Sequence, residues 1–266
     1  MAHASHPSFK TDGLTHTKLW RYISFSKLVE ILRTRSIFFS NLGNLAENDA
    51  KEGLYTEADR ASWNRPFSQL LEWERNYLKQ IDAASWDKIR SVTLNFMDQA
   101  RLSRRQFGVS CWHASDHENF AMWKIYAQEN SGICIQTNFE RLTKAFNAYT
   151  EDNIYIGLVN YRDYLAESIG IGNSFDVAIS KRREFSYEKE VRAVICRFGI
   201  ATGTDGQTAM DLSKDTIGDG IIAAADVDEL IERVFVSPYA ENYVAEAVRD
   251  VLGRYGFSKE VLKSAI

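Results

Sequence analysis

The chain has 266 residues, a formal net charge of −4 and 45% hydrophobic residues. These values are ordinary for a folded protein, and they disfavour both a disordered chain and a broadly basic nucleic-acid-binding protein. The three cysteines, Cys111, Cys134 and Cys196, are odd in number and far apart, which indicates free thiols in a reducing compartment. Since the sequence has neither a secretory signal nor a long apolar run, we expect a cytoplasmic protein without membrane contact.

The pattern predicts one domain over residues 1–266, starting with a flexible tail over about residues 1–15. Strands are expected over residues 18–23 and 36–40, because both segments mix aromatic and β-branched residues. A short helix with an apolar stripe separates them. From about residue 55 to 105, apolar residues recur at three- and four-residue spacings, which predicts either a helical insertion or a lid.

The rest of the chain alternates short strands with helices of unequal length. The predicted strands are residues 107–112, 132–136, 155–161, 188–198, 233–237 and a last one near Val261. The predicted helices are residues 118–129, a short one from Phe139, 174–183 and 242–255, and a loop is expected over residues 199–220. Because this order lacks the regularity of βαβ units, it predicts an α+β fold with a mixed or antiparallel sheet flanked by helices.

The charged segment Glu188-Lys189-Glu190-Val191-Arg192 is a candidate site. In a strand with a period of two residues, Glu188, Glu190 and Arg192 lie on one face. They form either a solvent-exposed strand end with an ion pair or a carboxylate held by an arginine at a cleft. In the second case the carboxylate can stabilise a developing cation. The local sequence leaves both interpretations open.

Arginine and aromatic residues provide further candidates. Arg21, between Trp20 and Tyr22, is either a surface residue or a ligand for a phosphate or carboxylate group. Trp123 and Tyr126 share one face of a predicted helix. They are either core residues or a stacking platform for an aromatic ligand.

Cys111, His113 and His117 are close in sequence and could suggest a metal site. A tetrahedral zinc site needs a further ligand, however, and the neighbouring sequence offers none. We therefore expect surface histidines and no bound metal. The sequence also lacks the motifs typical of the familiar nucleotide-binding folds and hydrolases.

Taken in order, several segments resemble a bacterial family known as domain of unknown function 2971. The matching segments are Leu19–Ser40, Glu47–Gly53, Val109–Tyr126, the strand GICI that begins at Gly132, and Phe185–Val194. The resemblance covers about residues 19–240 and is poorest in the helical block.

That family is similar in layout to ADP-ribosyltransferases, which implies a split sheet and a site built from Arg, Ser and Glu. The resemblance assigns these positions to Arg21, Ser110 and Glu190, with Glu188 as the first acid of an E-x-E motif. The middle motif is S-C-W instead of the S-T-S of members that modify arginine, so the acceptor type stays open.

The implied activity is cleavage of the nicotinamide–ribose bond of NAD and transfer of ADP-ribose to an unknown acceptor, as in a toxin or antiphage effector. Glu190 would stabilise the cationic ribose, and Glu188 would act as a base for the acceptor. Arg21 would bind a phosphate or the ribose, and Ser110 would orient the first strand and the ribose.

Other residues are expected to contact NAD. Trp112, Trp123 or Tyr126 would flank the nicotinamide, and Tyr22 would lie beside the arginine of the first strand. Arg192 would keep the carboxylate of the E-x-E motif ionised by lowering its pKa.

Three other functions are compatible with the sequence. The chain could hydrolyse NAD with water as the acceptor, or it could be a noncatalytic nucleotide- or protein-binding regulatory module. A metal-dependent nuclease would use Asp49, Glu52 and Glu190, whose spacing is not convincing for a metal site.

Overall fold

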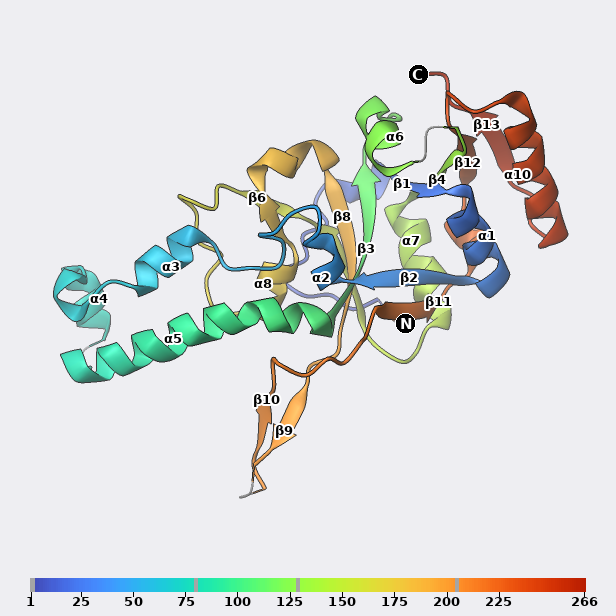
Figure 1. Ribbon diagram of the computed structural model, residues 1–266. Coiled ribbons are helices and arrows are strands. Elements are labelled where there is room, and N and C mark those ends of the chain that lie inside the picture. The colour runs from blue at the N-terminus through green and yellow to red at the C-terminus, as the bar shows by residue number, and fades with distance from the viewer. Residues whose placement is uncertain (1–2, 79–80, 128–129, 204–205) are drawn as a thin grey trace.

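A forked β-sheet forms the centre of the molecule (Figure 1). In the computed structural model, which describes residues 3–78, 81–127, 130–203 and 206–266, strand β3 (Phe107–Ala114) pairs along one edge with β8 (Glu190–Cys196). Strand β8 in turn pairs with β5 (Ile154–Leu158). The other edge of β3 is shared between β2 (Ser36–Asn41) and β1 (Lys18–Ser24).

The fork arises because these two strands meet β3 at opposite ends. Residues 108–109 of β3 pair with β2, and residues 113–114 pair with β1. Among the described strands, none pairs with residues 110–112 on this edge, so the sheet is open there. The open stretch of β3 faces the gap between β1 and β2.

Each wing of the fork is extended by further strands. Strand β2 pairs with β11 (Gly220–Ala224), and β1 continues through β4 (Gly132–Asn138), β12 (Arg233–Val236) and β13 (Glu260–Lys263). The pairing of β12 with β13 is parallel, and the other pairings in this sheet are antiparallel. The predicted α+β fold with a mixed sheet and flanking helices is thus confirmed.

Helices cover both faces of the wing that contains β1 and β4. The main core on one face includes residues of α1 (Phe25–Thr34), α7 (Phe139–Ala145), α9 (Val227–Leu230) and α10 (Asn242–Arg254). On the other face, α6 (Phe120–Tyr126) packs Met122 and Trp123 against β1 and β4. Within the described ranges, no helix has the length and apolar character needed to cross a membrane.

Helix α1 follows from local sequence signals. Ser24 caps its N-terminus by accepting a hydrogen bond from the backbone nitrogen of Lys27 at 3.3 Å. The predicted apolar stripe is buried, and the helix ends at Arg35, which adopts a left-handed conformation. The cap places Lys27 in the first turn of the helix, next to the end of β1.

The N-terminal segment, expected to be a flexible tail, packs against β5 in its described part. Phe9 is buried and stacks on Tyr155 with ring centroids 5.4 Å apart. The backbone nitrogen of Leu158 donates a hydrogen bond to the carbonyl of Lys10 at 2.8 Å. The sequence does not reveal this packing because the apolar partners of Phe9 lie far away along the chain.

Gly157 in β5 allows this close approach, and we expect Gly157→Ala to lower the free energy of unfolding by about 1–3 kcal/mol. A Cβ at this position would lie 2.8 Å from backbone atoms of Phe9, so the N-terminal segment would have to move. Urea denaturation measures the effect. Gly253→Ala is the matched control, because Gly253 is helical and has open space around it, so that change is expected to be neutral or stabilising. Equal stabilities for the two variants would contradict the prediction.

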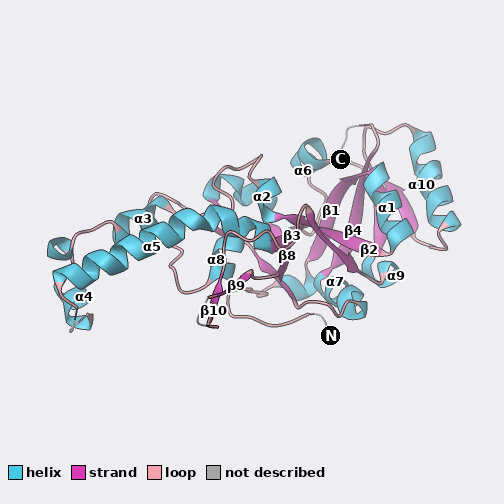
Figure 2. Cartoon of the chain, turned by 60° about the horizontal axis from the view of Figure 1, so that its bottom comes forward, coloured by secondary structure: helices cyan, strands magenta, loops and turns pink. Residues whose placement is uncertain are grey.

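The predicted helical block forms an arm that extends away from the sheet (Figures 1 and 2). It consists of α3 (Glu57–Trp63), a 3-10 turn at Phe67–Gln69, α4 (Glu72–Tyr77) and α5 (Ala83–Ser103). The 21 residues of α5 span about 31 Å. Asp59 anchors the arm by accepting hydrogen bonds from the backbone nitrogens of Ile169 and Gly170.

Several predicted elements have other bounds. The predicted helix over residues 118–129 corresponds to the shorter α6, and residues 128–129 lie outside the described residues. The predicted helix over residues 174–183 was wrong in its second half, since α8 (Ser174–Ala178) is followed by β7 (Ser180–Arg182), which pairs with β6 (Asn160–Arg162). The expected loop over residues 199–220 contains the hairpin of β9 (Ile200–Thr202) and β10 (Thr208–Met210). A short helix, α2 (Leu42–Leu45), follows β2.

Candidate functional site

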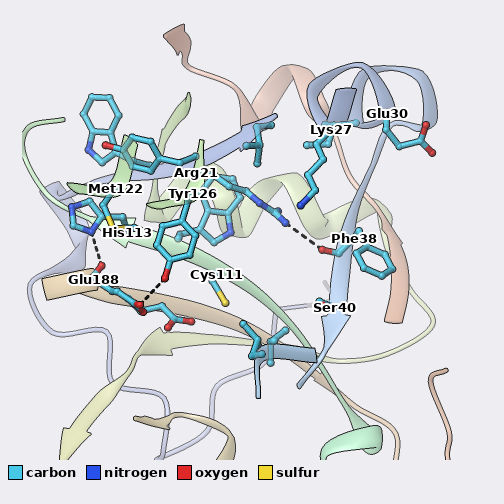
Figure 3. Close-up of a pocket in the computed structure, with 18 of the residues that line it drawn as sticks. Arg21, Lys27, Glu30, Phe38, Ser40, Cys111, His113, Met122, Tyr126 and Glu188 are labelled. Carbon is cyan, nitrogen blue, oxygen red and sulfur yellow. Dashed lines mark hydrogen bonds between the residues drawn. The ribbon is translucent and has the colours of Figure 1, made fainter. Parts of the chain in front are cut away.

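A cavity of about 490 Å³ lies at the open fork of the sheet (Figure 3). Its walls come from β1, β2, β3, α1 and α6, from Leu45 and Ile222, and from Lys181, Glu188 and Glu190. This volume is within the range of small-molecule binding sites in proteins. None of the described lining residues belongs to the helical arm.

Arg21 reaches across the fork. Its Nη1 donates a hydrogen bond to Ser110 Oγ at 2.9 Å, and its Nη2 donates to the carbonyl oxygen of Phe38 at 3.3 Å. Its Cζ lies 5.3 Å from the centre of the Trp112 ring. Among the described residues, no carboxylate forms an ion pair with Arg21. Burial lowers the pKa of Arg21 to about 10, so the guanidinium still carries its charge at neutral pH.

Ser110 lies behind Arg21 and positions it. Its side chain is almost fully buried, and Oγ accepts a second hydrogen bond from Trp112 Nε1 at 3.2 Å. The structure therefore brings together the Arg and Ser expected from the resemblance. Ser110 is not among the lining residues of the cavity, whereas Arg21 and Trp112 are.

A buried charge cluster, Glu52, Lys181, Glu188, Glu190 and Arg192, forms the opposite end of the site. None of the five is more than 5% exposed. Arg192 binds both oxygens of Glu190, with Nε–Oε1 at 2.7 Å and Nη2–Oε2 at 3.0 Å. Its Nη1 donates to Glu52 Oε1 at 3.0 Å. Arg192 therefore holds two carboxylates in place.

Lys181 joins the third carboxylate to this cluster. Its Nζ lies 2.5 Å from Glu188 Oε2, 3.4 Å from Glu190 Oε2 and 3.6 Å from Glu52 Oε2. Burial disfavours the charged ammonium, but the surrounding carboxylates outweigh this effect and raise the pKa of Lys181. Three carboxylates and two cations leave the cluster with a formal charge of −1 when all are ionised.

The predicted strand geometry of Glu188 was wrong. Glu188 ends a 3-10 segment (Arg183–Glu188), and β8 begins at Glu190. Between them, Lys189 has a φ of 41°, in the left-handed region that few residues other than glycine adopt. The two glutamates share a site because both contact Lys181, and not because they alternate along a strand.

Glu190 is an ionised carboxylate at the cavity wall. Burial opposes its ionisation, but the charges of Arg192 and Lys181 outweigh burial and lower the pKa of Glu190 to about 2. A hydrogen bond from Cys111 acts in the same direction. Because a thiol is a weak donor, a ligand hydroxyl can replace it. The sequence-based expectation that Arg192 keeps Glu190 ionised agrees with this geometry.

The depressed pKa of Glu190 predicts a loss of stability in acid. The pKa is about 2 in the folded protein against an ordinary value of 4.5, so the unfolded chain binds more protons between these values. The stabilisation from Glu190 is therefore complete above the ordinary value and is lost as the pH falls toward 2. Glu52 has the opposite effect on the pH dependence of stability, because burial raises its pKa. The stabilisation linked to this raised pKa is present at low pH and is lost as the pH rises through it.

We expect Glu190→Gln to lose less stability than the unchanged chain between about pH 5.5 and about pH 3. Urea denaturation at the two pH values measures the difference. An identical loss in both proteins would show that Glu190 does not titrate with a lowered pKa.

His113 was expected at the surface, and this prediction was wrong. Its side chain is 2% exposed and lines the cavity from β3. Nδ1 is hydrogen-bonded to the carbonyl oxygen of Glu188, so this nitrogen carries the proton. Nε2 is buried and has no hydrogen-bond partner among the described residues, and burial lowers the pKa of His113. The predicted strand ended at residue 112, whereas β3 runs to Ala114, so His113 lies on the same strand as Cys111 and two residues from it.

The predicted aromatic residues divide into two groups. Tyr22, Trp112 and Tyr126 line the cavity, and the Tyr126 hydroxyl donates to Glu188 Oε1 at 2.6 Å. Trp123 instead lies in the core below Tyr22, with ring centroids 5.0 Å apart, and is not a lining residue. The expected contact between Trp123 and nicotinamide is therefore not provided by this geometry.

The carboxylates considered for a nuclease site are occupied by basic side chains. Asp49 accepts a hydrogen bond from Arg182 Nε at 2.9 Å, while Glu52 and Glu190 are bound by Arg192. In the part of the chain that the structure describes, no group of three or more potential ligands is placed to hold one metal ion. The geometry offers no support for the nuclease interpretation.

Comparison with known proteins connects part of this site to a family. The family described as "Protein of unknown function (DUF2971)" matches residues 122–193, which confirms the resemblance over this segment. The segment contains Tyr126, Lys181, Glu188, Glu190 and Arg192. No curated protein and no solved structure matches the chain.

Proposed function

We propose that the chain cleaves the nicotinamide–ribose bond of NAD and transfers ADP-ribose to an acceptor. The observation that carries the proposal is that a cationic and an anionic side chain line the same cavity. Arg21, which has no anionic partner among the described residues, lies at the fork, and the ionised Glu190 lies in the wall of the same cavity. An anionic substrate that develops positive charge at one end fits both features.

The reaction places its positive charge on the ribose. The bond between C1′ and the ring nitrogen breaks, and its electron pair neutralises the pyridinium as nicotinamide leaves. The ribose becomes oxocarbenium-like, as in glycoside hydrolysis. A nucleophile then attacks C1′ and gives its proton to a base, the task proposed for Glu188. With water as the nucleophile the product is ADP-ribose, and with a macromolecule it is an ADP-ribosylated acceptor.

Several residues in and behind the cavity wall then have defined tasks. Glu190 accepts a hydrogen bond from a ribose hydroxyl and stabilises the cation, while Arg192 and Lys181 keep the carboxylate ionised and fixed. Arg21 binds a phosphate, and Ser110 fixes the direction of its guanidinium.

A second candidate, nucleotide binding without cleavage, is favoured by one observation. Both oxygens of Glu190 already bind Arg192, and those of Glu188 bind Tyr126 and Lys181. Carboxylates saturated in this way can serve to fix the shape of a pocket instead of reacting.

Nicotinamide release from NAD by the purified chain tests the proposal, with and without cell lysate as a source of acceptors. Release of both nicotinamide and free ADP-ribose would identify hydrolysis. Release stimulated by lysate, with label from adenine-labelled NAD on a macromolecule, would identify transfer. Binding of NAD without release would favour the second candidate and contradict cleavage.

A further inference from the structure

The end of the cavity away from Glu190 contains a second cation. Lys27, in the first turn of α1, lines the cavity, and its side chain points toward the Arg21 guanidinium and Phe38 (Figure 3). Among the described residues, Lys27 forms no ion pair. Glu30 also lines this end, but it binds Arg33 on the same helix through two hydrogen bonds, at 3.0 and 2.8 Å. Glu30, the one acidic residue of α1, is therefore already paired with a cation.

Two cations that face one cavity repel each other unless an anion lies between them. Arg21 offers a planar fork of donors, and Lys27 offers a compact, mobile charge, so together they suit an anion with more than one charged group. The position of Arg21 is fixed by Ser110 and by the Phe38 carbonyl, whereas Lys27 is exposed and can adjust its reach. This combination fits a diphosphate better than a single carboxylate.

An exposed aromatic ring lies at the same end. Phe38 is 45% exposed and lines the cavity beside Ile222, its partner in the register between β2 and β11. The ring lies against the backbone at Gly220, where an added Cβ would be 2.5 Å from Cζ of Phe38. The absence of a side chain at Gly220 thus lets the ring rest against the sheet while the residue stays 45% exposed. A flat heterocycle can stack on such a ring.

We infer that this end of the cavity is a nucleoside diphosphate subsite, in which Lys27 and Arg21 bind the two phosphates and Phe38 stacks on the base. The inference rests on the proposed function only for the orientation of bound NAD in the cavity, with its nicotinamide end facing Glu190. The binding of a free nucleoside diphosphate does not depend on cleavage.

Calorimetric titration of the full chain with ADP tests the subsite at low ionic strength. Lys27→Ala is expected to weaken ADP binding about tenfold or more, as for the loss of a hydrogen bond to a charged group, while Lys27→Arg keeps most of the affinity. Lys88→Ala is the matched control, because Lys88 is exposed on α5 outside the cavity and the variant makes the same change in charge. AMP should bind more weakly than ADP.

Inorganic pyrophosphate separates the two parts of the subsite. Phe38→Ala is expected to weaken binding of ADP but not of pyrophosphate, whereas Lys27→Ala weakens binding of both. No binding of ADP to the unchanged chain, or unchanged ADP binding in folded Lys27→Ala and Phe38→Ala, would overturn the inference. ADP binding without nicotinamide release would support the subsite and contradict cleavage. Nicotinamide release that neither substitution affects would support cleavage and contradict the subsite.

Discussion

Replacing Glu190 with Gln is expected to reduce nicotinamide release from NAD by about 10²–10³-fold. The substitution removes the negative charge that faces the developing ribose cation but keeps the size of the side chain. The carbonyl oxygen of Gln can still accept a hydrogen bond from Arg192, so the variant is expected to fold. Initial rates of nicotinamide release, measured at saturating NAD, report the effect, and thermal denaturation verifies that the variant is folded.

Glu188→Gln is the matched control for this prediction. It removes a charge from the same cluster, two residues away, but the proposed task of Glu188 is to receive a proton from the acceptor. We expect this variant to release nicotinamide at a rate much closer to that of the unchanged chain and to modify acceptors more slowly. A folded Glu190→Gln variant with undiminished release would end the proposed role of Glu190.

Arg192→Met is expected to lower the free energy of unfolding by about 3–5 kcal/mol, the largest effect on stability that we predict. Arg192 is completely buried and binds Glu190 and Glu52, and it also donates to the carbonyl of Ala178. Met fills a similar volume but leaves two buried carboxylates with only Lys181 as a cation. Urea denaturation at neutral pH measures the loss.

Two further variants isolate the cause. Arg33→Met breaks the ion pair between Arg33 and Glu30, which is exposed, so no measurable change is expected. Adding Glu52→Gln to Arg192→Met removes one of the uncompensated charges and should recover part of the lost stability. A cost for Arg192→Met of less than about 1 kcal/mol would mean that the carboxylates do not depend on Arg192.

The segment from residue 18 to 41 shows how much local sequence can specify. Its two strands and the helix between them were predicted from β-branched and aromatic content, a serine cap and an apolar stripe, and the structure confirms all three. These signals act between residues at most a few positions apart, so a single sequence contains them.

The charge cluster shows where such reasoning fails. Lys181 was assigned to a helix over residues 174–183 and to no site, yet it binds Glu188 and lies near Glu190 and Glu52. Glu52 was considered only for a nuclease site. Spacing along the chain gives no indication that residues 52 and 192 are in contact, because that contact depends on how distant segments pack.

The sequence by itself determined the α+β class, because periodicity and helix caps are local properties. Its resemblance to a family with an ADP-ribosyltransferase-like layout implied the roles of Arg21, Ser110, Glu188 and Glu190. Only the tertiary structure decided where the sheet forks, which charges neutralise one another and that His113 is buried. Strand register and burial bring residues far apart in sequence into contact, and the free energy of a charge depends on those contacts. For this reason two arginines differ in their surroundings. Arg192 forms a buried ion pair, whereas Arg21 lines a cavity and has no anionic partner among the described residues.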